Sequence, residues 1–256
     1  MLDYAAFPEQ RQALIRELLQ QEGRVVCAAL SARLKVSEHT VRRDLKELAA
    51  EGVCKRVHGG AVSIMADGGE LTRRASEPSG EKLALAQAAA RLIKPGACLF
   101  IDAGSTNLEL AKVLPAGLAL TVVTNSPLVA TAALAQPECE VIMLGGVIQR
   151  KTGGSLGITA QSQLQGIHFD QTFLGACALD PEQGVTAFDF QDAEFKRAVI
   201  AQSSEVIVAL TAHKFPGVAR FAVAGCEEIS TLLVDRAAMG NKLALLEDKE
   251  VSILFA

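Results

Sequence analysis

The segment Ile101–Asn107, with the sequence IDAGSTN, has the residue types and context of an anion-binding loop. It follows an apolar run that favours a strand and opens a pattern that favours a helix. Backbone N–H groups at the start of a helix point outward and attract negative charge, and the hydroxyls of Ser105 and Thr106 add donors. With Gly104, these residues predict a phosphate site. The simpler interpretation, in which Ser105 is only a helix N-cap, stays open.

Polar and glycine-rich loops recur next to the other predicted strands. Each loop alone is typical of turns, Asx caps or a solvated lysine. Gathered at the carboxyl edge of a parallel sheet, they would line one crevice with donors and cations. Besides Gly104, Ser105 and Thr106, the predicted effector-binding residues are Asp102, Asn107, Thr124, Asn125, Ser126, Gly145, Gly146, Arg150, Gly154, Asp170, Gly175, Lys196 and Lys214. They favour a small phosphorylated, hydroxylated ligand.

A second group of residues, near the N-terminus, has the spacing of a DNA-reading helix. Apolar positions 41, 45 and 48 form a buried stripe, which leaves cations on the opposite face. Arg pairs with the two acceptors of guanine, and flanking cations contact phosphates. Asp44 is predicted to be a structural partner of a neighbouring cation. The predicted DNA contacts are Ser37, His39, Thr40, Arg42, Arg43 and Lys46, followed by Lys55, Arg56, His58 and Gly59 on a hairpin.

The same basic side chains could instead form a solvated helix face, and a winged helix can also be a protein-contact module. The turn spacing, the apolar stripe and the basic hairpin agree with one another. Together they favour DNA binding over both alternatives.

The elements that position these residues differ between the two parts of the chain. Periodicity over residues 8–62 predicts helices at 8–21, 28–34 and from Ser37 to about Glu51, then a hairpin over 53–63 with a Gly-Gly turn. This order predicts a winged helix-turn-helix domain over residues 1–62. Residues 63–80 combine glycines with mixed charges and little periodicity, which predicts a linker.

From residue 81 onward, apolar strands alternate with amphipathic helices. Strands are predicted near 97–102, 118–123, 139–144, 171–176, 205–210, 231–234 and 250–255, and helices at 81–93, 106–113, 127–135, 159–165, 190–202 and 237–246. This alternation predicts an α/β fold over residues 81–256, Rossmann-like and largely parallel.

Composition and charge limit the possible functions. The 256 residues are 50% hydrophobic and 21% charged, as in a soluble globular protein of one or two domains. The net charge of −4 argues against a DNA-binding protein, yet residues 1–62 carry +2 and residues 63–256 carry −6. The negative net charge of the whole chain therefore hides a small, basic N-terminal region that could bind DNA.

Several functions find no support in the chain. It has no secretory signal and no apolar run long enough to span a membrane, so a cytoplasmic protein is expected. Six widely spaced cysteines without a C-x-x-C pair predict buried, reduced thiols. No metal site is predicted, and without a Walker or G-x-G-x-x-G pattern no cofactor is expected.

Two stretches resemble the DeoR family of bacterial transcription regulators. Ser37-x-x-Thr40-Val41-Arg42-Arg43-Asp44-Leu45, followed by Arg56-Val57-His58-Gly59-Gly60-Ala61, is similar to the family's DNA-binding domain. Residues 81–250 are similar to its effector-binding domain, through the Gly-Ser-Thr loop, Thr124-Asn125-Ser126, Gly145-Gly146, Gly153-Gly154, Asp170-x-x-Phe173-x-Gly175, Gly184-Val185-Thr186, Lys196-Arg197 and Lys214-Phe215.

The resemblance implies a winged helix-turn-helix that binds operator DNA, usually as a repressor. It also implies a sensor domain that resembles ribose-5-phosphate isomerase in fold. This domain would bind phosphorylated sugars or related metabolites. Gly104, Ser105 and Thr106 would then hold phosphate, and Asp170 and Lys196 would lie near the sugar. Thr211 replaces an Asp and Gln149 an Arg of the family pattern, which suggests an altered effector preference.

The favoured function is therefore a repressor of a carbohydrate-utilisation operon, controlled by a phosphorylated sugar and not an enzyme. A dimer or tetramer is expected because operators are usually two-fold symmetric. The alternative is a sugar-phosphate isomerase or lyase that carries a winged helix. Thr211 makes an enzyme less favoured, because it stands where the family pattern has a carboxylate. No other pair of residues in the sequence has the spacing of a general acid and base.

Overall fold

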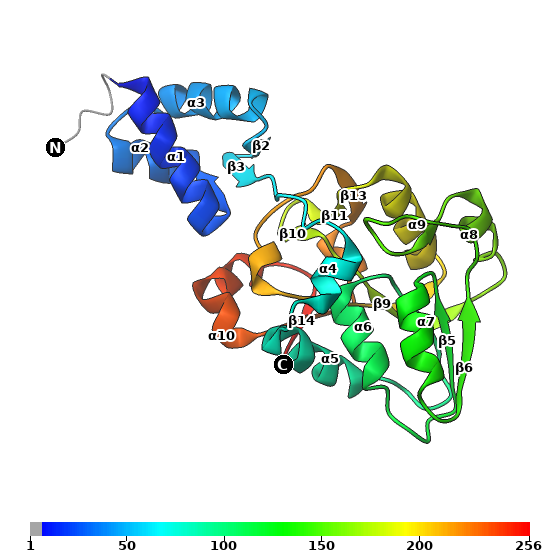
Figure 1. The fold of residues 1–256 in the computed structure, drawn as a ribbon. Coiled ribbons are helices and arrows are strands. Elements are labelled where there is room, and N and C mark those ends of the chain that lie inside the picture. The colour runs from blue at the N-terminus through cyan, green and yellow to red at the C-terminus, as the bar shows by residue number, and fades with distance from the viewer. Residues whose placement is uncertain (1–6) are drawn as a thin grey trace.

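A computed structural model describes residues 7–256 of the chain (Figure 1). The N-terminal domain consists of three helices, α1 (Pro8–Glu22), α2 (Cys27–Leu34) and α3 (Glu38–Ala50), and three short strands, β1 (Arg24–Val26), β2 (Cys54–Val57) and β3 (Gly60–Ser63). The predicted helices and hairpin are confirmed. Strand β1 was not predicted. It pairs antiparallel with β3, so the sheet order is β1-β3-β2.

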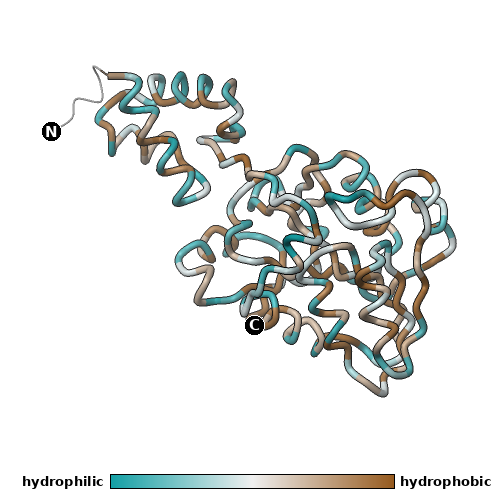
Figure 2. Tube along the Cα trace, viewed as in Figure 1, coloured by the Kyte–Doolittle hydropathy of each residue, from teal (hydrophilic) through white to brown (hydrophobic). Residues whose placement is uncertain are grey.

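Local sequence signals account for the boundaries of these helices. Pro8 occupies the first turn of α1, where its missing N–H is not needed, and Gly23 ends the helix in the left-handed conformation. Ser37 caps α3 by accepting a hydrogen bond from the backbone of Thr40 at 3.1 Å. The apolar stripe of α3 is fully buried against Ile15 of α1 and its neighbours, and Figure 2 shows brown and teal segments alternating along α1 and α3. This packing fixes which face of α3 points outward.

The sensor domain is built on a seven-stranded sheet that contains every strand predicted for it. The order is β15-β14-β12-β9-β4-β5-β6, and all pairings are parallel. The strands are β4 (Cys98–Ile101), β5 (Leu120–Thr124), β6 (Cys139–Met143), β9 (Phe169–Leu174), β12 (Ser203–Leu210), β14 (Thr231–Val234) and β15 (Ser252–Phe255). The predicted α/β class is confirmed.

Helices cover both faces of this sheet. The helices α5 (Gly80–Ala90), α6 (Ser105–Lys112) and α7 (Pro127–Leu134) share one apolar cluster with the strands. On the other face, α8 (Ile158–Ser162) and α9 (Phe190–Ile200) pack against Phe100 and Phe169. Because both faces are buried, the strands read as continuous apolar runs, which is why they were predictable.

The structure of the linker and the sensor domain departs from the predicted elements in four places. A second, antiparallel sheet contains β10 (Ala178–Asp180), β11 (Gly184–Ala187) and β13 (Phe221–Ala224), and β7 (Val147–Ile148) pairs with β8 (Ser155–Leu156). The predicted linker contains a helix, α4 (Leu71–Ser76). The predicted helix over 237–246 is only α10 (Arg236–Met239) followed by a 3-10 helix, because Gly240 adopts a positive φ of 51°.

The cysteine and membrane expectations can also be compared with the structure. All six cysteines are free, but only Cys27, Cys54 and Cys226 are buried. Cys98, Cys139 and Cys177 are half-buried, so the prediction of six buried thiols was wrong for these three. Among the described helices, none combines the length and the apolar composition that crossing a bilayer requires.

The two domains are held together at the end of the wing. The backbone N–H of Val218 donates to the carbonyl of Ser63 at 3.0 Å, and that of Met65 donates to the carbonyl of Val218 at 2.8 Å. Gly23 lies so close to the same loop that a Cβ on it would come within 2.2 Å of the Pro216 carbonyl oxygen. The chain therefore passes from β3 directly along the surface of the sensor domain.

Candidate DNA-binding surface and ligand cavity

The outer face of α3 is open to solvent, as a DNA-reading helix requires. The side chains of Arg42 and Arg43 are 58% and 77% exposed, and each pairs with a Glu four residues away, Glu38 and Glu47 respectively. Exposed pairs of this kind are worth little, so a base or a phosphate can replace the carboxylate. The other predicted contacts on α3 are exposed or, for Thr40, half-buried.

Asp44 has the structural role predicted for it. The carboxylate is buried and accepts two hydrogen bonds from Arg11 of α1, from Nε at 2.5 Å and from a terminal nitrogen at 2.9 Å. The hydrogen bond that Arg11 donates to Asp44 raises the Arg11 pKa, and this effect outweighs burial, which opposes the charge. This contact fixes α1 against α3 and removes Asp44 from the DNA-facing side.

The wing places four predicted DNA contacts around the turn between β2 and β3. Lys55, Arg56, His58 and Gly59 are all exposed. Gly59 has a φ of 73°, which a glycine adopts without strain and which keeps the turn tight. Lys55 is directed toward the sensor domain, where its Nζ donates to Oε1 of Gln183 at 2.7 Å.

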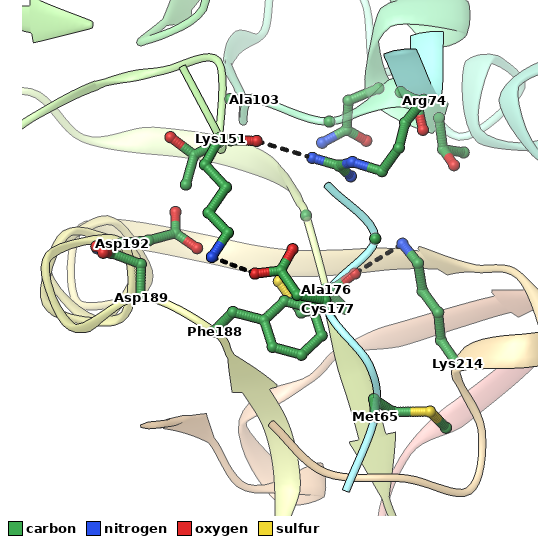
Figure 3. Close-up of a pocket in the computed structure, with 18 of the residues that line it drawn as sticks. Met65, Arg74, Ala103, Lys151, Ala176, Cys177, Phe188, Asp189, Asp192 and Lys214 are labelled. Carbon is green, nitrogen blue, oxygen red and sulfur yellow. Dashed lines mark hydrogen bonds and ion pairs between the residues drawn. The ribbon is translucent and has the colours of Figure 1, made fainter. Parts of the chain in front are cut away.

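A cavity of about 170 Å³ lies at the carboxyl ends of the central strands β4, β9 and β12 (Figure 3). This is the edge at which a parallel α/β sheet is expected to bind ligands. One wall is the start of α6, and others are the loop after β9 and helix α9. Residues of the linker, from Met65 to Gly69 and Arg74, close the remaining side.

The start of α6 has the geometry of an anion site. Gly104 holds the N-cap position and therefore makes no side-chain cap, which leaves the first N–H groups of the helix available to a ligand. Ser105 is the first helical residue, so its interpretation as an N-cap was wrong. The amide of Asn107 donates to the carbonyls of Asp102 and Phe173, at 3.0 and 2.9 Å, and thereby anchors the loop to both strands.

A buried cluster of charges lies beneath this loop. Lys196 Nζ is 2.5 Å from Asp192 Oδ2 and 3.5 Å from Asp102 Oδ2. Burial raises the pKa of Asp102 to about 6, although Lys196 opposes the shift. Burial also disfavours the Lys196 charge, but Asp102 and Asp192 together keep its pKa above the ordinary value. The Lys196 ammonium is thus neutralised by the protein itself.

Three further cations line the cavity. Burial lowers the pKa of Lys214 to about 8, and its Nζ donates to the Ala176 carbonyl at 2.8 Å. Lys151 forms an ion pair with Asp67. Arg74 donates to the Lys151 carbonyl at 3.4 Å, and among residues 7–256 its buried Nε has no hydrogen-bond partner.

Sequence reasoning missed Arg74 and Asp192. No periodic pattern in residues 63–80 marks a structured wall, so nothing distinguished Arg74. Asp192 lies four residues before Lys196, and this helical ion-pair spacing was a signal that could have identified it.

Most of the predicted effector residues come together, in two layers. The cavity is lined by Gly104, Ser105, Thr106, Asn107, Gly175, Lys196 and Lys214. A second layer supports the loop without lining the cavity: Asp102, Thr124, Asn125, Ser126 and Gly154. Within it, Asn125 accepts from the Ala103 N–H at 3.1 Å, and Asp102 accepts from the Gly175 N–H at 2.9 Å.

Other predicted residues lie elsewhere. Asp170 was placed near the sugar, and this prediction was wrong. Strand β9 begins at Phe169, so Asp170 stands at the amino edge of the sheet, where its carboxylate accepts from the Cys98 N–H at 2.8 Å. Gly145, Gly146 and Arg150 also lie outside the cavity lining, because the chain turns away there into the β7–β8 hairpin.

The two departures from the family pattern were expected at the sugar end of the ligand, and this expectation was wrong as well. Neither Gln149 nor Thr211 lines the cavity. Each carries a buried side-chain oxygen that has no hydrogen-bond partner within the described part of the chain.

A helix-turn-helix with an exposed basic face, joined to an α/β domain whose cavity is lined by a helix start and by cations, defines a ligand-responsive DNA-binding regulator. Comparison with known families agrees with this class. The DeoR-like helix-turn-helix domain matches residues 11–66, and the DeoR C terminal sensor domain matches residues 77–236. The chain belongs to the DeoR family of transcription regulators.

Relatives of similar length carry regulator names. The HTH-type transcriptional regulator GlpR of Haloferax volcanii is 33% identical over 96% of this chain and 97% of its own length. The glycerol-3-phosphate regulon repressor of Escherichia coli is 29% identical over 95% of this chain and 97% of its own.

Structural similarity to an enzyme is weak. Ribose 5-phosphate isomerase A of Methanocaldococcus jannaschii is 17% identical, with a TM-score of 0.37 over 52% of each chain. A similarity of this size carries no argument about activity. Family membership, in contrast, places the chain among DNA-binding transcription regulators, and no relative named here supports the enzyme alternative.

Proposed function

We propose that this protein represses a carbohydrate-utilisation operon, and that a phosphorylated sugar or related metabolite bound in the cavity controls its affinity for operator DNA. The observation that carries the proposal is the uncapped start of α6 in a cavity that also receives Arg74 and Lys214. Helix N–H groups, together with cations that form no ion pair among the described residues, favour a phosphate.

The size of the cavity restricts the ligand. Pockets for drug-sized molecules measure ~300–1,000 Å³, whereas this cavity has about 170 Å³. A glycerol phosphate or a single sugar phosphate suits it better than a dinucleotide. The name of the glycerol-3-phosphate regulon repressor points to the same chemical class for a relative.

We further propose that α3 and the wing bind the operator, with residues 1–62 as the reader, 63–80 as the linker and 81–256 as the sensor. An effector that binds one arrangement of the domains better than the other shifts the population toward it. Residues 65–69 of the linker line the cavity, so the ligand touches the segment that connects the domains. The protein acts in the cytoplasm on operator DNA, as a dimer or tetramer that matches a two-fold operator.

The test combines a ligand screen with DNA binding. Thermal stability is measured with sn-glycerol 3-phosphate, ribose 5-phosphate and fructose 1-phosphate, each beside its unphosphorylated parent. A ligand at ~100 times its dissociation constant adds about 2.7 kcal/mol of stability. Binding to DNA from the neighbouring promoter should depend steeply on salt, and the active ligand should change it. Equal responses to both members of every pair, or no specific DNA binding, would refute the proposal.

A further inference from the structure

We infer that Arg74 of α4 is the residue that selects phosphorylated over unphosphorylated ligands, by binding the anionic group that lies at the start of α6. The inference rests on the proposed function, and it assigns a ligand-binding role to a residue of the linker. No sequence motif marks Arg74.

The first argument is the hydrogen bonding of Arg74. A guanidinium carries five N–H donors in a planar fork. The bond from Arg74 to the Lys151 carbonyl is long, at 3.4 Å, and Nε is buried without a partner among the described residues. Buried donors without an acceptor are rare in folded proteins. An anionic ligand in the cavity supplies the acceptor that Nε lacks.

The second argument is position. Helix α4 packs against α6, and Arg74 lines the same cavity as Ser105, Thr106 and Asn107. In Figure 3 the Arg74 side chain points toward the Lys151 backbone, and Lys214 lies below it on the same side of the view. One phosphate can therefore contact the α6 N–H groups and the Arg74 fork together.

The third argument is the state of the other cations. Lys196 is held between two carboxylates, and Lys151 is paired with Asp67. Lys214 presents a single ammonium that already donates to the Ala176 carbonyl. Arg74 interacts electrostatically with Asp67, but it forms no ion pair with a carboxylate among residues 7–256. Its fork matches the geometry of a phosphate better than an ammonium does.

The consequence concerns signalling. Arg74 belongs to the segment that continues from the wing strand β3, and Met65 in that segment is hydrogen-bonded to Val218 of the sensor domain. A phosphate that joins Arg74 to α6 fixes this segment on the sensor domain. Recognition of the phosphate and control of the linker therefore depend on the same side chain.

The test is calorimetric titration of the full-length chain at constant ionic strength. The probes are sn-glycerol 3-phosphate, ribose 5-phosphate and fructose 1-phosphate, with their unphosphorylated parents and inorganic phosphate. The variants are R74Q, which removes the charge, and R74K, which keeps the charge without the fork. R91Q is the matched control, because Arg91 is exposed at the end of α5 and outside the cavity.

For the phosphorylated probe that binds the wild type best, R74Q should raise the dissociation constant about tenfold or more, since charge-assisted bonds are lost. R74K should give a smaller rise, and R91Q should behave as the wild type. Melting temperatures without ligand identify any variant that fails to fold. If R74Q fails to fold, the affinity of R74K for the phosphorylated probe tests the role of Arg74.

Two failures can be told apart. If the wild type binds a phosphorylated probe and both Arg74 variants bind it equally well, the role of Arg74 is wrong while the proposed function stands. If the wild type binds no phosphorylated probe, or binds each parent sugar equally well, the proposed function and the role of Arg74 both fail.

Discussion

Lys55 of the wing, a predicted DNA contact, donates a hydrogen bond from Nζ to Oε1 of Gln183 in the sensor domain, at 2.7 Å. Arg24 contacts the same turn through ion pairs with Asp180 and Glu182. If Lys55 contacts DNA as predicted, its ammonium must exchange Gln183 of the sensor domain for a phosphate. The prediction therefore links the position of the wing on the turn between β10 and β11 to DNA binding.

The first prediction concerns this docking. Arg24→Gln removes the cation from Asp180, whose carboxylate is fully buried. Hydrogen bonds to charged groups are worth ~1.5–3 kcal/mol each, so the free energy of unfolding should fall by about that amount. Cleavage of residues 63–80 by a protease should become faster. Denaturant unfolding checks the first expectation and limited proteolysis the second.

Arg33→Gln is the control for this change, because Arg33 and Glu22 are exposed and 4.0 Å apart. Its effect should stay within ~0.5 kcal/mol. Equal stability of the two variants would show that the Arg24 contact does not hold the domains together.

The second prediction concerns α3. Arg43→Ala should weaken operator binding by ~1–3 kcal/mol and relax specificity at one base pair, whereas Lys46→Ala should lower the salt slope by about one. Both side chains are exposed, so neither change should shift the melting temperature. Fluorescence anisotropy at several salt concentrations measures the affinity and the slope. Unchanged binding by both variants would exclude α3 as the reading helix.

The third prediction distinguishes the buried Asp44 of α3 from the exposed, positively charged side chains of the same helix. Asp44→Ala removes both hydrogen bonds from Arg11, and each charged bond is worth ~1.5–3 kcal/mol. The N-terminal domain should unfold at lower denaturant concentration, and DNA binding should weaken as a consequence. Ligand binding in the sensor domain should persist. A variant that loses DNA binding at full stability would instead make Asp44 a base-reading residue.

The fourth prediction is a pH dependence set by Lys214. Burial, with smaller contributions from the nearby charges of Arg74, Lys196 and Lys82, lowers its pKa to about 8, while Cys177 opposes the shift. The ammonium therefore loses its proton as the pH rises through about 8. A phosphorylated ligand should bind more weakly above that pH, by up to ~1.4 kcal/mol per pH unit.

Folding stability should move in the opposite direction. In the unfolded chain Lys214 keeps its proton up to its ordinary pKa of 10.5, whereas in the folded chain it loses the proton near pH 8. Between these two pH values the unfolded state therefore binds more protons than the folded state. Stability from this group then rises with pH in that window. Lys214→Met should abolish both dependences, measured by titration calorimetry and by denaturation at several pH values. A variant with the wild-type profile would assign the titration to another group.

The main sheet was predictable because each of its strands is an apolar run between polar loops. The strand order was not, because β9 lies between β4 and β12 in space although two other strands of the same sheet, β5 and β6, separate it from β4 in the chain. The small antiparallel sheet was missed because its strands have only three or four residues, which is too short for a period to show.

The candidate site was predicted best where a residue lies in the loop just after a strand, as Gly104 does after β4 and Gly175 does after β9. Asp170 was placed near the sugar only by the family resemblance. Whether the strand begins at residue 171, as predicted, or at Phe169, as in β9, Asp170 lies at the amino edge of the sheet, far from the loops that form the cavity. Arg74 could not be found from its neighbours, because only the tertiary fold brings α4 to α6.

The last prediction tests the loop between β4 and α6 through Gly175. A Cβ at this position would lie 2.8 Å from Asp102 Oδ2 and 3.0 Å from the Ala103 carbonyl oxygen. The same Asp102 oxygen accepts the Gly175 N–H, so Gly175→Ala must push the two strand ends apart. The start of α6 then moves, and affinity for a phosphorylated ligand should fall about tenfold, as expected when charge-assisted hydrogen bonds are misaligned.

Gly80→Ala is the matched control, because no atom lies within 4 Å of the added Cβ and alanine suits the first turn of α5. DNA binding without ligand should be the same in both variants, since the change at Gly175 lies in the sensor domain. Titration calorimetry measures the ligand affinity and anisotropy the DNA affinity. If Gly175→Ala binds the phosphorylated ligand as tightly as Gly80→Ala does, the start of α6 is not where the phosphate lies.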